Sequence, residues 1–339
     1  MASITISVVL ATFNGERYLE EQLASIARQH RPPDELVVGD DGSNDGTLDM
    51  IERFRRSSAF PVTVIHNRHS GVGTNFLTSV EASQGRYIAF ADQDDVWLPS
   101  KLDRLLAVVQ DRKADLVAHG VRSVDERLHP TRTGYPRVHR VVVEDRLQGN
   151  VWFPIGGNAM LFDRGLLDGC DWALRPASQW STGQMNHDDL VKLLAAVRGR
   201  TVRIPDRLIL YRQHRSNVEG ASKTLAQAAR THTDHSDRIR HRIAAASEWA
   251  RFFAPLAGPD FEIETEKYFL DARAQMEARL ARLTERPARA VASIGLSVAK
   301  GEYSRRRTDG LDWRWALQDL LSVVKGWPAG QAGPARRDD

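Results

Sequence analysis

The chain has 339 residues, of which 42% are hydrophobic and 27% are charged, and its formal net charge at pH 7 is +3. This composition is typical of a globular protein with a sizeable core, and the interspersed charges argue against a nucleic-acid partner, which usually meets a concentrated basic face. The single cysteine, Cys170, excludes an intrachain disulfide and a cysteine zinc site and is typical of a reducing compartment.

The first 120 residues alternate between strand and helix signals. Residues 6–11 form a near-continuous β-rich run, apolar residues then recur at helical spacing over 19–26, and Pro32 with Pro33 ends that helix. Such alternation predicts an α/β fold with a parallel, doubly wound sheet and right-handed crossovers. The remaining predicted strands are 35–39, 62–66, 87–90 and 116–118, and the remaining helices are 47–56, one through 76–80 and one from 99.

The second half carries weaker signals. Residues 125–150 are polar and basic, which predicts a loop or an edge insertion. After about residue 222, Ala, Arg and Glu recur at helical spacing, which predicts a helical appendage. Between these segments the sequence predicts a strand over 154–162 entered through a glycine turn, a helix over 190–197 capped by 186–189, and short strands at 201–204 and 208–211.

These signals divide the chain into three parts. A sheet domain is predicted over 1–222, with a first half at 1–120 and a second half at 121–222. A helical region follows over 223–327, and the Gly-, Pro- and Arg-rich tail at 328–339 is predicted to be disordered.

An acidic cluster follows the apolar strand 87–90. It contains Asp92, Asp94 and Asp95. Alternate residues of an extended segment point the same way, so Asp92 and Asp94 can share one ligand. Hard divalent cations take a few carboxylates and leave their other positions to water and phosphate oxygens. The pair therefore suits Mg²⁺ or Mn²⁺ carrying a diphosphate; the alternative is a solvated acidic turn that caps the helix beginning near Pro99.

Several common nucleotide and catalytic motifs are absent from the sequence. Residues 71–76 begin like a dinucleotide fingerprint, but Phe76 replaces the last glycine and the segment follows the third strand rather than the first. A Gly-x-x-x-x-Gly-Lys loop, a Gly-x-Ser-x-Gly elbow and a His-Glu-x-x-His pair are all missing. These observations argue against a Rossmann dehydrogenase, a kinase, a hydrolase and a zinc protease.

Polar motifs stand in order at the ends of the first four predicted strands: 12–14, 40–47, 67–75 and 92–97. This series resembles the family 2 glycosyltransferases, inverting enzymes with the GT-A fold, over about residues 4–220. Residues 156–162 are similar to the glycine-led acceptor strand of the family, with Asn158 in place of the usual small or Cys residue. Among subgroups, the residue patterns at 92–97 and 211–217 are most similar to those of bacterial rhamnosyltransferases, although Asp189 and Leu190 stand where that subgroup tends to have aromatics.

The resemblance implies a nucleotide-binding first half, an acceptor-binding second half and a GT-A sheet that is mostly parallel with a C-terminal helical appendage. It implies that Asp41 hydrogen-bonds the base and that Asp94 ligates Mg²⁺ or Mn²⁺ together with Asp92. His214 is either a further metal ligand, a diphosphate contact or a loop histidine. The residues implied to bind the nucleotide-sugar are Thr12, Asn14, Asp41, Asn75 and Asp92.

The resemblance also implies a catalytic carboxylate at Asp188, which follows His187 at a predicted helix start. Direct displacement with inversion needs one base to take the proton of the acceptor hydroxyl, and a cation would neutralise the charge on the leaving diphosphate. The alternative for Asp188 or Asp189 is a helix N-cap, where aspartate is favoured. We favour catalysis for Asp188 and a structural role for Asp189.

Other notable side chains are assigned structural or surface roles. Trp97 is predicted to pack behind the acidic loop, and His232 and His235 are predicted to be solvated because an i, i+3 pair alone is a poor metal signal. The three arginines at 305–307 precede the amphipathic stretch 313–324. That region either docks on anionic lipid or packs on the core, and packing is the more economical interpretation.

The sequence as a whole predicts a metal-dependent inverting glycosyltransferase of bacterial cell-envelope polysaccharide synthesis. The donor would be a dTDP- or UDP-sugar, with L-rhamnose as the candidate sugar, and the acceptor a hydroxyl of a cell-surface glycan or lipid-linked glycan. The alternatives are a nucleotidyltransferase and a non-catalytic nucleotide- or glycan-binding module. No charged and then apolar leader and no run of roughly 18 apolar residues is present, so we expect a cytoplasmic protein, with contact at the inner face of the plasma membrane as the open alternative.

Overall fold

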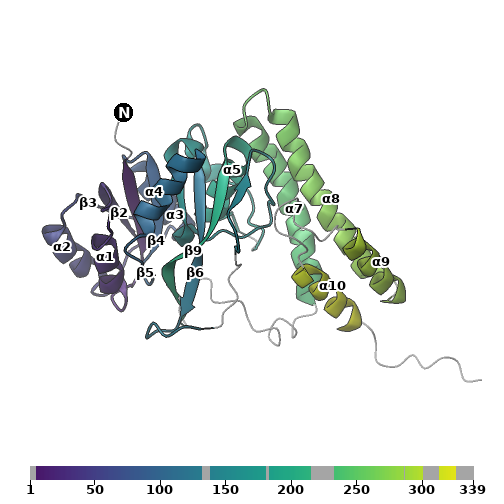
Figure 1. Ribbon diagram of the computed structural model, residues 1–339, viewed down its shortest axis with the longest axis horizontal. Helices are drawn as coiled ribbons and strands as arrows, with labels where there is room; N and C mark the ends of the chain where they lie inside the picture. Colours follow the sequence, from purple (N-terminus) through teal and green to yellow (C-terminus); the bar gives the residue numbers. More distant parts are fainter. Residues whose placement is uncertain are drawn as a thin grey trace, which may run out of the picture.

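A central sheet with helices on both faces and a helical extension on one side makes up the protein (Figure 1). The computed structural model describes residues 5–131, 138–180, 183–214, 233–285, 287–300 and 313–325. The strands are β1 (Ile6–Thr12), β2 (Glu35–Asp40), β3 (Val62–His66), β4 (Tyr87–Asp92), β5 (Val96–Trp97), β6 (Leu116–Val124), β7 (Val142–Glu144), β8 (Met160–Asp163) and β9 (Thr201–Arg212). The helices are α1 (Leu19–Ala27), α2 (Thr47–Ser57), α3 (Val72–Glu81), α4 (Lys101–Arg112), α5 (His187–Arg198), α7 (Thr233–Leu256), α8 (Glu262–Thr284), α9 (Pro287–Ala299) and α10 (Trp313–Lys325).

The sheet is mixed but mostly parallel in its first half. The strands run in the order β3-β2-β1-β4-β8-β6-β9-β5, and β7 pairs with β9. β1 is parallel to β2 and β4, β2 to β3, and β6 to β9. β8 is antiparallel to both of its neighbours, β4 and β6. The predicted α/β fold with a mostly parallel sheet and added C-terminal helices is therefore confirmed, and β8 is the strand at which the first half of the sheet joins the second.

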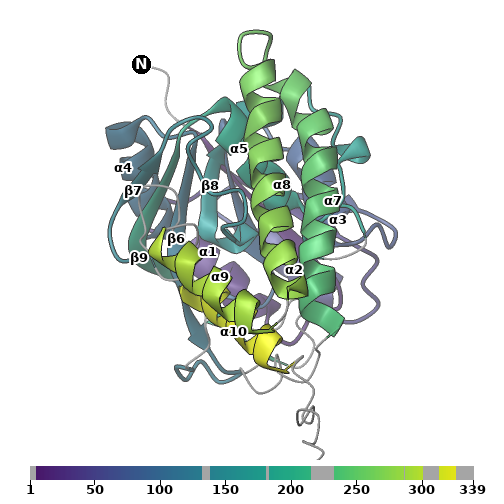
Figure 2. The same cartoon turned by 90° about the vertical axis from the view of Figure 1, so that its right-hand side faces the viewer.

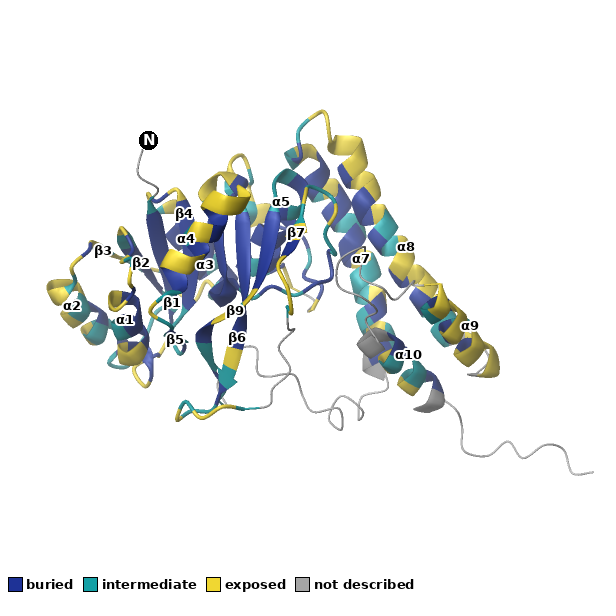
Figure 3. Cartoon of the chain, in the orientation of Figure 1, coloured by how far each residue is buried: buried dark blue, intermediate teal, exposed yellow. Residues whose placement is uncertain are grey.

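The inner strands are buried on both faces, which explains their continuous apolar sequence. Val8 and Leu10 pack in a cluster with α1, α2 and α4, whereas Val9 packs in a second cluster with α3 and α5. Because side chains alternate along a strand, a strand covered on both sides must be apolar at every position. In Figure 3 the inner strands are buried along their length, while α2 and α4 turn one exposed face to solvent.

The two short strands predicted at 201–204 and 208–211 form one strand, β9. Pro205 lies in its middle and has no N–H to donate to a ladder. The register of β9 against β6 shifts between Ala118 and Gly120, so the strand passes the proline at an irregularity instead of ending there. β7 pairs with the first part of β9 and β5 with the last part.

Three other boundaries differ from the prediction. The insertion predicted over 125–150 contains the edge strand β7. The strand predicted over 154–162 is shorter, because the 3-10 turn Gly157–Ala159 precedes β8. Helix α5 begins at His187, so Asn186 is at the cap position as predicted, while 187–189 form the first turn.

The helical appendage continues the core of the sheet domain. α7 and α8 lie side by side, and α9 and α10 form a second pair at an angle to them (Figure 2). Trp249 of α7 lies 5.2 Å, ring to ring, from Trp152 in the loop before β8, and Phe253 and Phe269 extend this packing between α7 and α8. One hydrophobic cluster thus runs from the sheet through α5 into α7 and α8. None of the described helices combines the length and the apolar composition that a bilayer crossing requires.

The prediction that His235 is solvated is wrong. His235 is 8% exposed, and its Nε2 lies 2.8 Å from Oδ1 of the fully buried Asp319. The same carboxylate accepts a 2.8 Å hydrogen bond from Arg279, so the cluster joins α7, α8 and α10. The partner of His235 is 84 residues away in sequence, where spacing along one helix gives no signal. His232, the arginines at 305–307, the tail at 328–339 and the boundary near 222 lie outside the described residues.

Candidate active site

The ends of four strands bring the predicted polar motifs to one edge of the sheet. Thr12 at the end of β1 is in register with Asp40 of β2, and Ala11 with Asp92 of β4. Asp40 is in turn in register with His66 at the end of β3. The carboxyl ends of parallel strands are where open α/β sheets bind their ligands. The structure therefore gathers the motifs into a single candidate site.

The floor of the site is held by a residue that sequence reasoning did not single out, Asp40. Its carboxylate accepts a 2.9 Å hydrogen bond from the Thr12 hydroxyl and a 2.6 Å hydrogen bond from the Ser43 hydroxyl. It also accepts from the backbone N–H groups of Gly42 and Ser43. Thr12 is 2% exposed. Its hydroxyl therefore fixes the loop after β2 from inside, and its role toward a nucleotide stays a prediction.

Asp41 ties two loops together. Its carboxylate accepts hydrogen bonds of 2.6 Å and 2.9 Å from the backbone N–H and the hydroxyl of Ser70, and one of 2.9 Å from the N–H of Gly71. Gly71 has φ 81°, in the left-handed region that glycine adopts without strain. Asp41 thus shapes the turn that leads into α3, and the predicted contact with a base is not tested by this arrangement.

The two predicted asparagines occupy different depths. Asn14 is exposed, has φ 47°, and its Oδ1 accepts a hydrogen bond of 2.9 Å from the N–H of Asn44. Asparagine is one of the few residues that tolerate this backbone region. Asn75 is 2% exposed, donates to the Gly39 carbonyl at 2.8 Å and accepts from Asn67 at 2.7 Å. Asn14 therefore lies on the rim of the site, and Asn75 braces α3 against the end of β2.

The acidic loop is joined to the first loop by a side-chain clamp. The Gln93 side chain accepts a 2.9 Å hydrogen bond from the N–H of Phe13 and donates one of 3.0 Å to its carbonyl. The clamp fixes the loop after β1 against the loop after β4.

Asp94 and His214 meet although they are far apart in sequence. The Nε2 atom of His214 lies 2.8 Å from Oδ2 of Asp94. The His214 ring packs against Tyr18 with a centroid distance of 4.9 Å. Arg212, two residues earlier at the end of β9, donates from Nε to the Asp94 carbonyl at 2.8 Å and lies with its guanidinium 4.5 Å from the Tyr18 ring. The end of β9 thus places the guanidinium of Arg212 and the imidazole of His214 against the acidic loop.

The third carboxylate of the loop is structural. Asp95 is fully buried and accepts hydrogen bonds from the Asn158 side chain at 2.7 Å and from the N–H of Arg212 at 3.0 Å. Burial, and then the neighbouring carboxylates of Asp94 and Asp92, raise the pKa of Asp95 well above its usual value. Asn158, where the family usually has a small residue or Cys, therefore links the acidic loop to the segment before β8.

A buried lysine lies below this link. Lys101 is fully buried, donates from Nζ to the Asn158 carbonyl at 2.7 Å and lies 3.5 Å above the centre of the Trp97 ring. Burial lowers the pKa of Lys101, while Asp95 and Asp92 oppose that shift. Trp97 is 2% exposed, which confirms that it packs behind the acidic loop.

The predicted metal ligands are assembled only in part. Asp94 and His214 are in contact, and Asp92 is partly exposed at the start of the same loop. Within the described ranges, no group of three or more His, Cys, Asp or Glu side chains is arranged to hold a metal ion. A carboxylate with a neighbouring imidazole fits a divalent cation that takes its remaining ligands from diphosphate and water.

Asp188 and Asp189 lie side by side in the first turn of α5 but have different surroundings. Asp189 is 4% exposed, forms an ion pair with Lys192 and accepts a hydrogen bond of 3.1 Å from Gln179. Asp188 is partly exposed, and its Oδ1 accepts a 2.8 Å hydrogen bond from the N–H of Asp189. Asp188 thus satisfies one free N–H of the first turn and still reaches the surface. Asn186, at the cap position, makes no side-chain capping bond.

His187 is a packing residue. Its ring stacks on Phe76 at 3.9 Å and meets Phe90 edge-on at 4.7 Å. Burial, with a smaller effect of Arg175, lowers the pKa of His187 to about 3, so the ring is neutral near pH 7. A Cβ atom added at Gly157 would lie 2.5 Å from Nε2 of His187 and 3.5 Å from the Cβ of Asp188. The glycine turn before β8 therefore lets α5 approach and sets the position of Asp188.

Replacing Gly157 by alanine is expected to lower the free energy of unfolding by about 1–3 kcal/mol, as overpacking in a tight core usually does. The His187 ring cannot yield because two phenylalanine rings hold it. Chemical denaturation monitored by circular dichroism measures the change. The matched control is Gly295→Ala in α9, where an added Cβ meets nothing within 4 Å and alanine favours the helix. Equal stability of Gly157→Ala and wild type would contradict the close approach.

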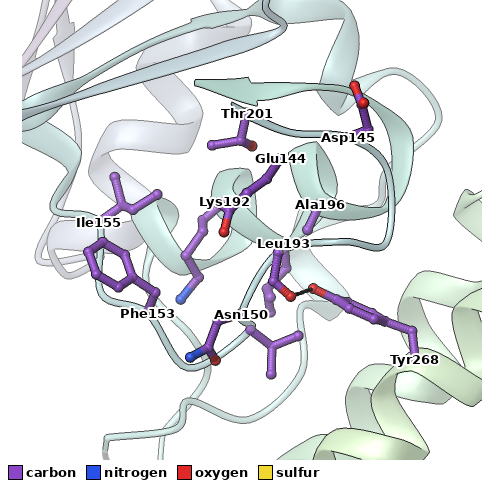
Figure 4. A pocket seen from close by; sticks show the side chains of 12 residues that line it. Glu144, Asp145, Asn150, Phe153, Ile155, Lys192, Leu193, Ala196, Thr201 and Tyr268 are labelled. Carbon is purple, nitrogen blue, oxygen red and sulfur yellow. Dashed lines mark hydrogen bonds between the residues drawn. The ribbon is translucent and has the colours of Figure 1, made fainter. Parts of the chain in front are cut away.

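A separate narrow pocket lies between α5, the loop before β8 and α8 (Figure 4). Lys192 extends into it from α5, and Tyr268 of α8 donates a 2.6 Å hydrogen bond to the Gly149 carbonyl at its side. The lining includes Glu144 and Asn150 but no residue of the acidic loop. The pocket therefore belongs to the junction between the sheet domain and the appendage.

Comparison with known proteins agrees with this geometry. Residues 7–168 match the model of Glycosyl transferase family 2. An uncharacterized glycosyltransferase of Nostoc sp. is 27% identical over 67% of this chain and 70% of its own length. The dTDP-rhamnosyl transferase RfbG of Shigella flexneri is 37% identical, but over only 27% of this chain and 34% of its own length. The crystal structure of residues 1–349 of TarS from S. aureus superposes with a TM-score of 0.56 at 17% identity, over 95% of this chain and 89% of that one.

The sheet order and the superposition with TarS show the GT-A fold, and the family-model match and the named relatives show a glycosyltransferase. The similarity to glycosyl transferase family 2 covers residues 7–168, just under half of the chain.

Proposed function

We propose that the protein is a metal-dependent inverting transferase that moves a sugar from a nucleoside diphosphate donor to a hydroxyl of a cell-surface glycan or a lipid-linked glycan. The observation that carries the proposal is the contact of Asp94 with His214 at the edge of the sheet where β1, β2 and β4 end. That contact presents a carboxylate and an imidazole where a diphosphate and its cation are expected.

The carboxylate on the acceptor side is connected to this edge through the glycine turn before β8. Asn158 hydrogen-bonds Asp95 of the acidic loop, and the preceding residue, Gly157, approaches Asp188. Gly73 in the first turn of α3 also approaches Asn186, immediately before α5. The start of α5 is thereby held near both the acidic loop and the loop after β3, which supports Asp188 as the general base.

In the proposed reaction, the acceptor oxygen attacks the anomeric carbon of the donor and the bond to the diphosphate breaks with inversion. Asp188 takes the proton of the acceptor hydroxyl, and the nucleoside diphosphate leaves. A divalent cation, Mg²⁺ or Mn²⁺, held by Asp94 with His214 and Asp92, would neutralise the charge that develops on the diphosphate. Asn14, at the rim of the site, and the loop fixed by Asp41 and Thr12 would border the nucleotide.

The names of relatives guide the choice of donor and acceptor. One aligned relative is a dTDP-rhamnosyl transferase and another is a poly(ribitol-phosphate) β-N-acetylglucosaminyltransferase. TarS residues 1–349 have also been crystallised with UDP-GlcNAc. These names support dTDP and UDP as the nucleotides to test, L-rhamnose as the first candidate sugar, and a bacterial surface polymer as the acceptor class.

A thermal-shift panel with UDP, dTDP and GDP, each with and without Mn²⁺, tests the proposal. A ligand that binds only the folded state raises stability, by about 2.7 kcal/mol at a concentration one hundred times its dissociation constant. We expect UDP or dTDP to raise the melting temperature only when Mn²⁺ is present. If no nucleotide does so, the transferase proposal fails. If a nucleotide binds but the corresponding nucleotide-sugar never releases nucleoside diphosphate, the protein is a binding module instead.

A further inference from the structure

Trp180 is an exposed aromatic residue on a loop that is otherwise well anchored. Its side chain is 48% exposed. Single exposed apolar residues are common on protein surfaces and need no explanation by themselves. Trp180 differs because its backbone N–H donates to the Ser178 hydroxyl at 3.0 Å and its ring lies 5.0 Å from the guanidinium of Arg242. The ring is therefore held in place while one part of it stays open to solvent.

The loop that carries Trp180 is fastened to α7. The N–H of Ala177 donates to Glu248 at 2.9 Å, and the Ala177 carbonyl accepts from the indole N–H of Trp249 at 2.9 Å. Arg242, nearly two turns earlier on α7, has its guanidinium 5.0 Å from the centre of the Trp180 ring and 5.8 Å from that of the buried Trp152 ring. Three residues of one helix thus position this short loop.

The same loop is fastened on its other side to the first turn of α5. Gln179 is 1% exposed and donates to Asp189 at 3.1 Å, and the N–H of Asp189 donates to Asp188 at 2.8 Å. Trp180 therefore follows a residue that is two hydrogen bonds from the proposed base. Among the described residues, the buried Oε1 of Gln179 has no hydrogen-bond partner.

The surroundings of the ring suit a carbohydrate better than an apolar partner. A pyranose offers C–H groups on one face, which pack on an aromatic ring, and hydroxyls at its edge, which need polar partners. Among the described residues, Trp180 contacts the Ser178 hydroxyl through its N–H and the Arg242 guanidinium through its ring, so both contacts are with polar or charged groups. Burial, followed by the nearby Arg279 and Arg238, lowers the pKa of Arg242 only to about 10, so it stays a cation near pH 7 and keeps its contact with the ring.

We propose that Trp180, oriented by Arg242 and the Gln179–Asp189 hydrogen bond, forms an acceptor subsite on which a pyranose ring of the glycan acceptor stacks. The inference rests on the proposed transferase function and assigns a residue for its acceptor side. An apolar protein partner or a membrane surface would require a contiguous apolar patch around the ring.

Fluorine NMR tests the subsite without turnover. The full chain is labelled with 5-fluorotryptophan at its eight tryptophans, and the resonance of Trp180 is assigned from Trp180→Phe. Methyl α-L-rhamnoside, methyl β-D-N-acetylglucosaminide and methyl α-D-galactoside are the probes. We expect at least one of them to shift the Trp180 resonance and to leave that of Trp172 in place, since the Trp172 indole is already bound to Glu81. If none shifts it up to the solubility limit, the proposal is overturned.

Kinetics with the glycoside that shifts the resonance separates recognition from structure. Trp180→Ala is expected to raise the KM for that acceptor about tenfold, because the loss of one stacked ring contact costs about 1.4 kcal/mol. Trp180→Tyr keeps an aromatic ring and is expected to have a KM close to that of the wild type. Trp172→Phe is the matched control with unchanged KM. The thermal shift by nucleotide and Mn²⁺ should be the same in Trp180→Ala and wild type. A reduced nucleotide shift, or no rise in KM, would contradict an acceptor subsite, whereas failure of the nucleotide panel in the wild type would instead reject the transferase function itself.

Discussion

Replacing Asp94 by asparagine is expected to lower the rate of sugar transfer by about 100-fold or more and to remove the Mn²⁺-dependent rise in melting temperature caused by the nucleotide. Asparagine keeps the size of the side chain but removes the charge that would hold a cation beside His214. Release of nucleoside diphosphate and differential scanning fluorimetry measure the two effects. Because Asp94 is on the acidic loop and its backbone carbonyl still accepts from Arg212, the fold itself should be retained.

Asp103→Asn in the first turn of α4 is the matched control. Asp103 is exposed, and its replacement removes one negative charge without touching the site. It should leave the rate and the nucleotide shift unchanged. A full Mn²⁺-dependent shift in Asp94→Asn would show that the cation is not held by this carboxylate.

Replacing Asp188 by asparagine is expected to lower kcat by about 10²–10⁴-fold, the usual contribution of a general base, while the binding of nucleotide and Mn²⁺ persists. The asparagine side chain can still accept from the N–H of Asp189, so the first turn of α5 should stay intact. Single-turnover transfer and the nucleotide thermal shift are the two measurements.

Asp189→Asn separates this chemical role from a structural one. Asp189 is buried in an ion pair with Lys192, and breaking such a pair costs about 3 kcal/mol or more of stability. We therefore expect Asp189→Asn to lower the melting temperature clearly, and Asp188→Asn to lower the rate with little change in melting temperature. The reverse pattern would exchange the roles of the two residues.

The architecture of the first half was readable from the sequence because its signals are local. A strand buried on both faces is apolar at nearly every position, as residues 6–10 are apart from Ser7, and the polar residues that follow must then lie at the carboxyl edge. That Asp92 and Asp94 share one ligand stays a prediction. Local signals of the same kind predicted the glycine turn before β8 and the helix α5 as two distinct elements.

The rest of the site depends on partners that are distant in sequence. Asn158 meets Asp95 across 63 residues, and Arg212 meets the Asp94 carbonyl across 118. No periodicity encodes such pairs, since they arise only when β8 and β9 take their places in the sheet. For the same reason the sequence indicated neither the burial of His235 nor the continuity of β9 through Pro205.

The continuous packing between the sheet domain and the appendage limits how the molecule can move. Trp249 and Phe253 of α7 share one core with Trp152 and with Leu190 of α5. A hinge that swung α7 and α8 away from α5 would expose these large side chains to water, at roughly 1.5–3 kcal/mol for each fully buried one. Opening of the acceptor side by rigid rotation of the appendage is therefore costly. Any motion that admits the proposed acceptor should therefore be confined to the loops, while α7 keeps its position against α5.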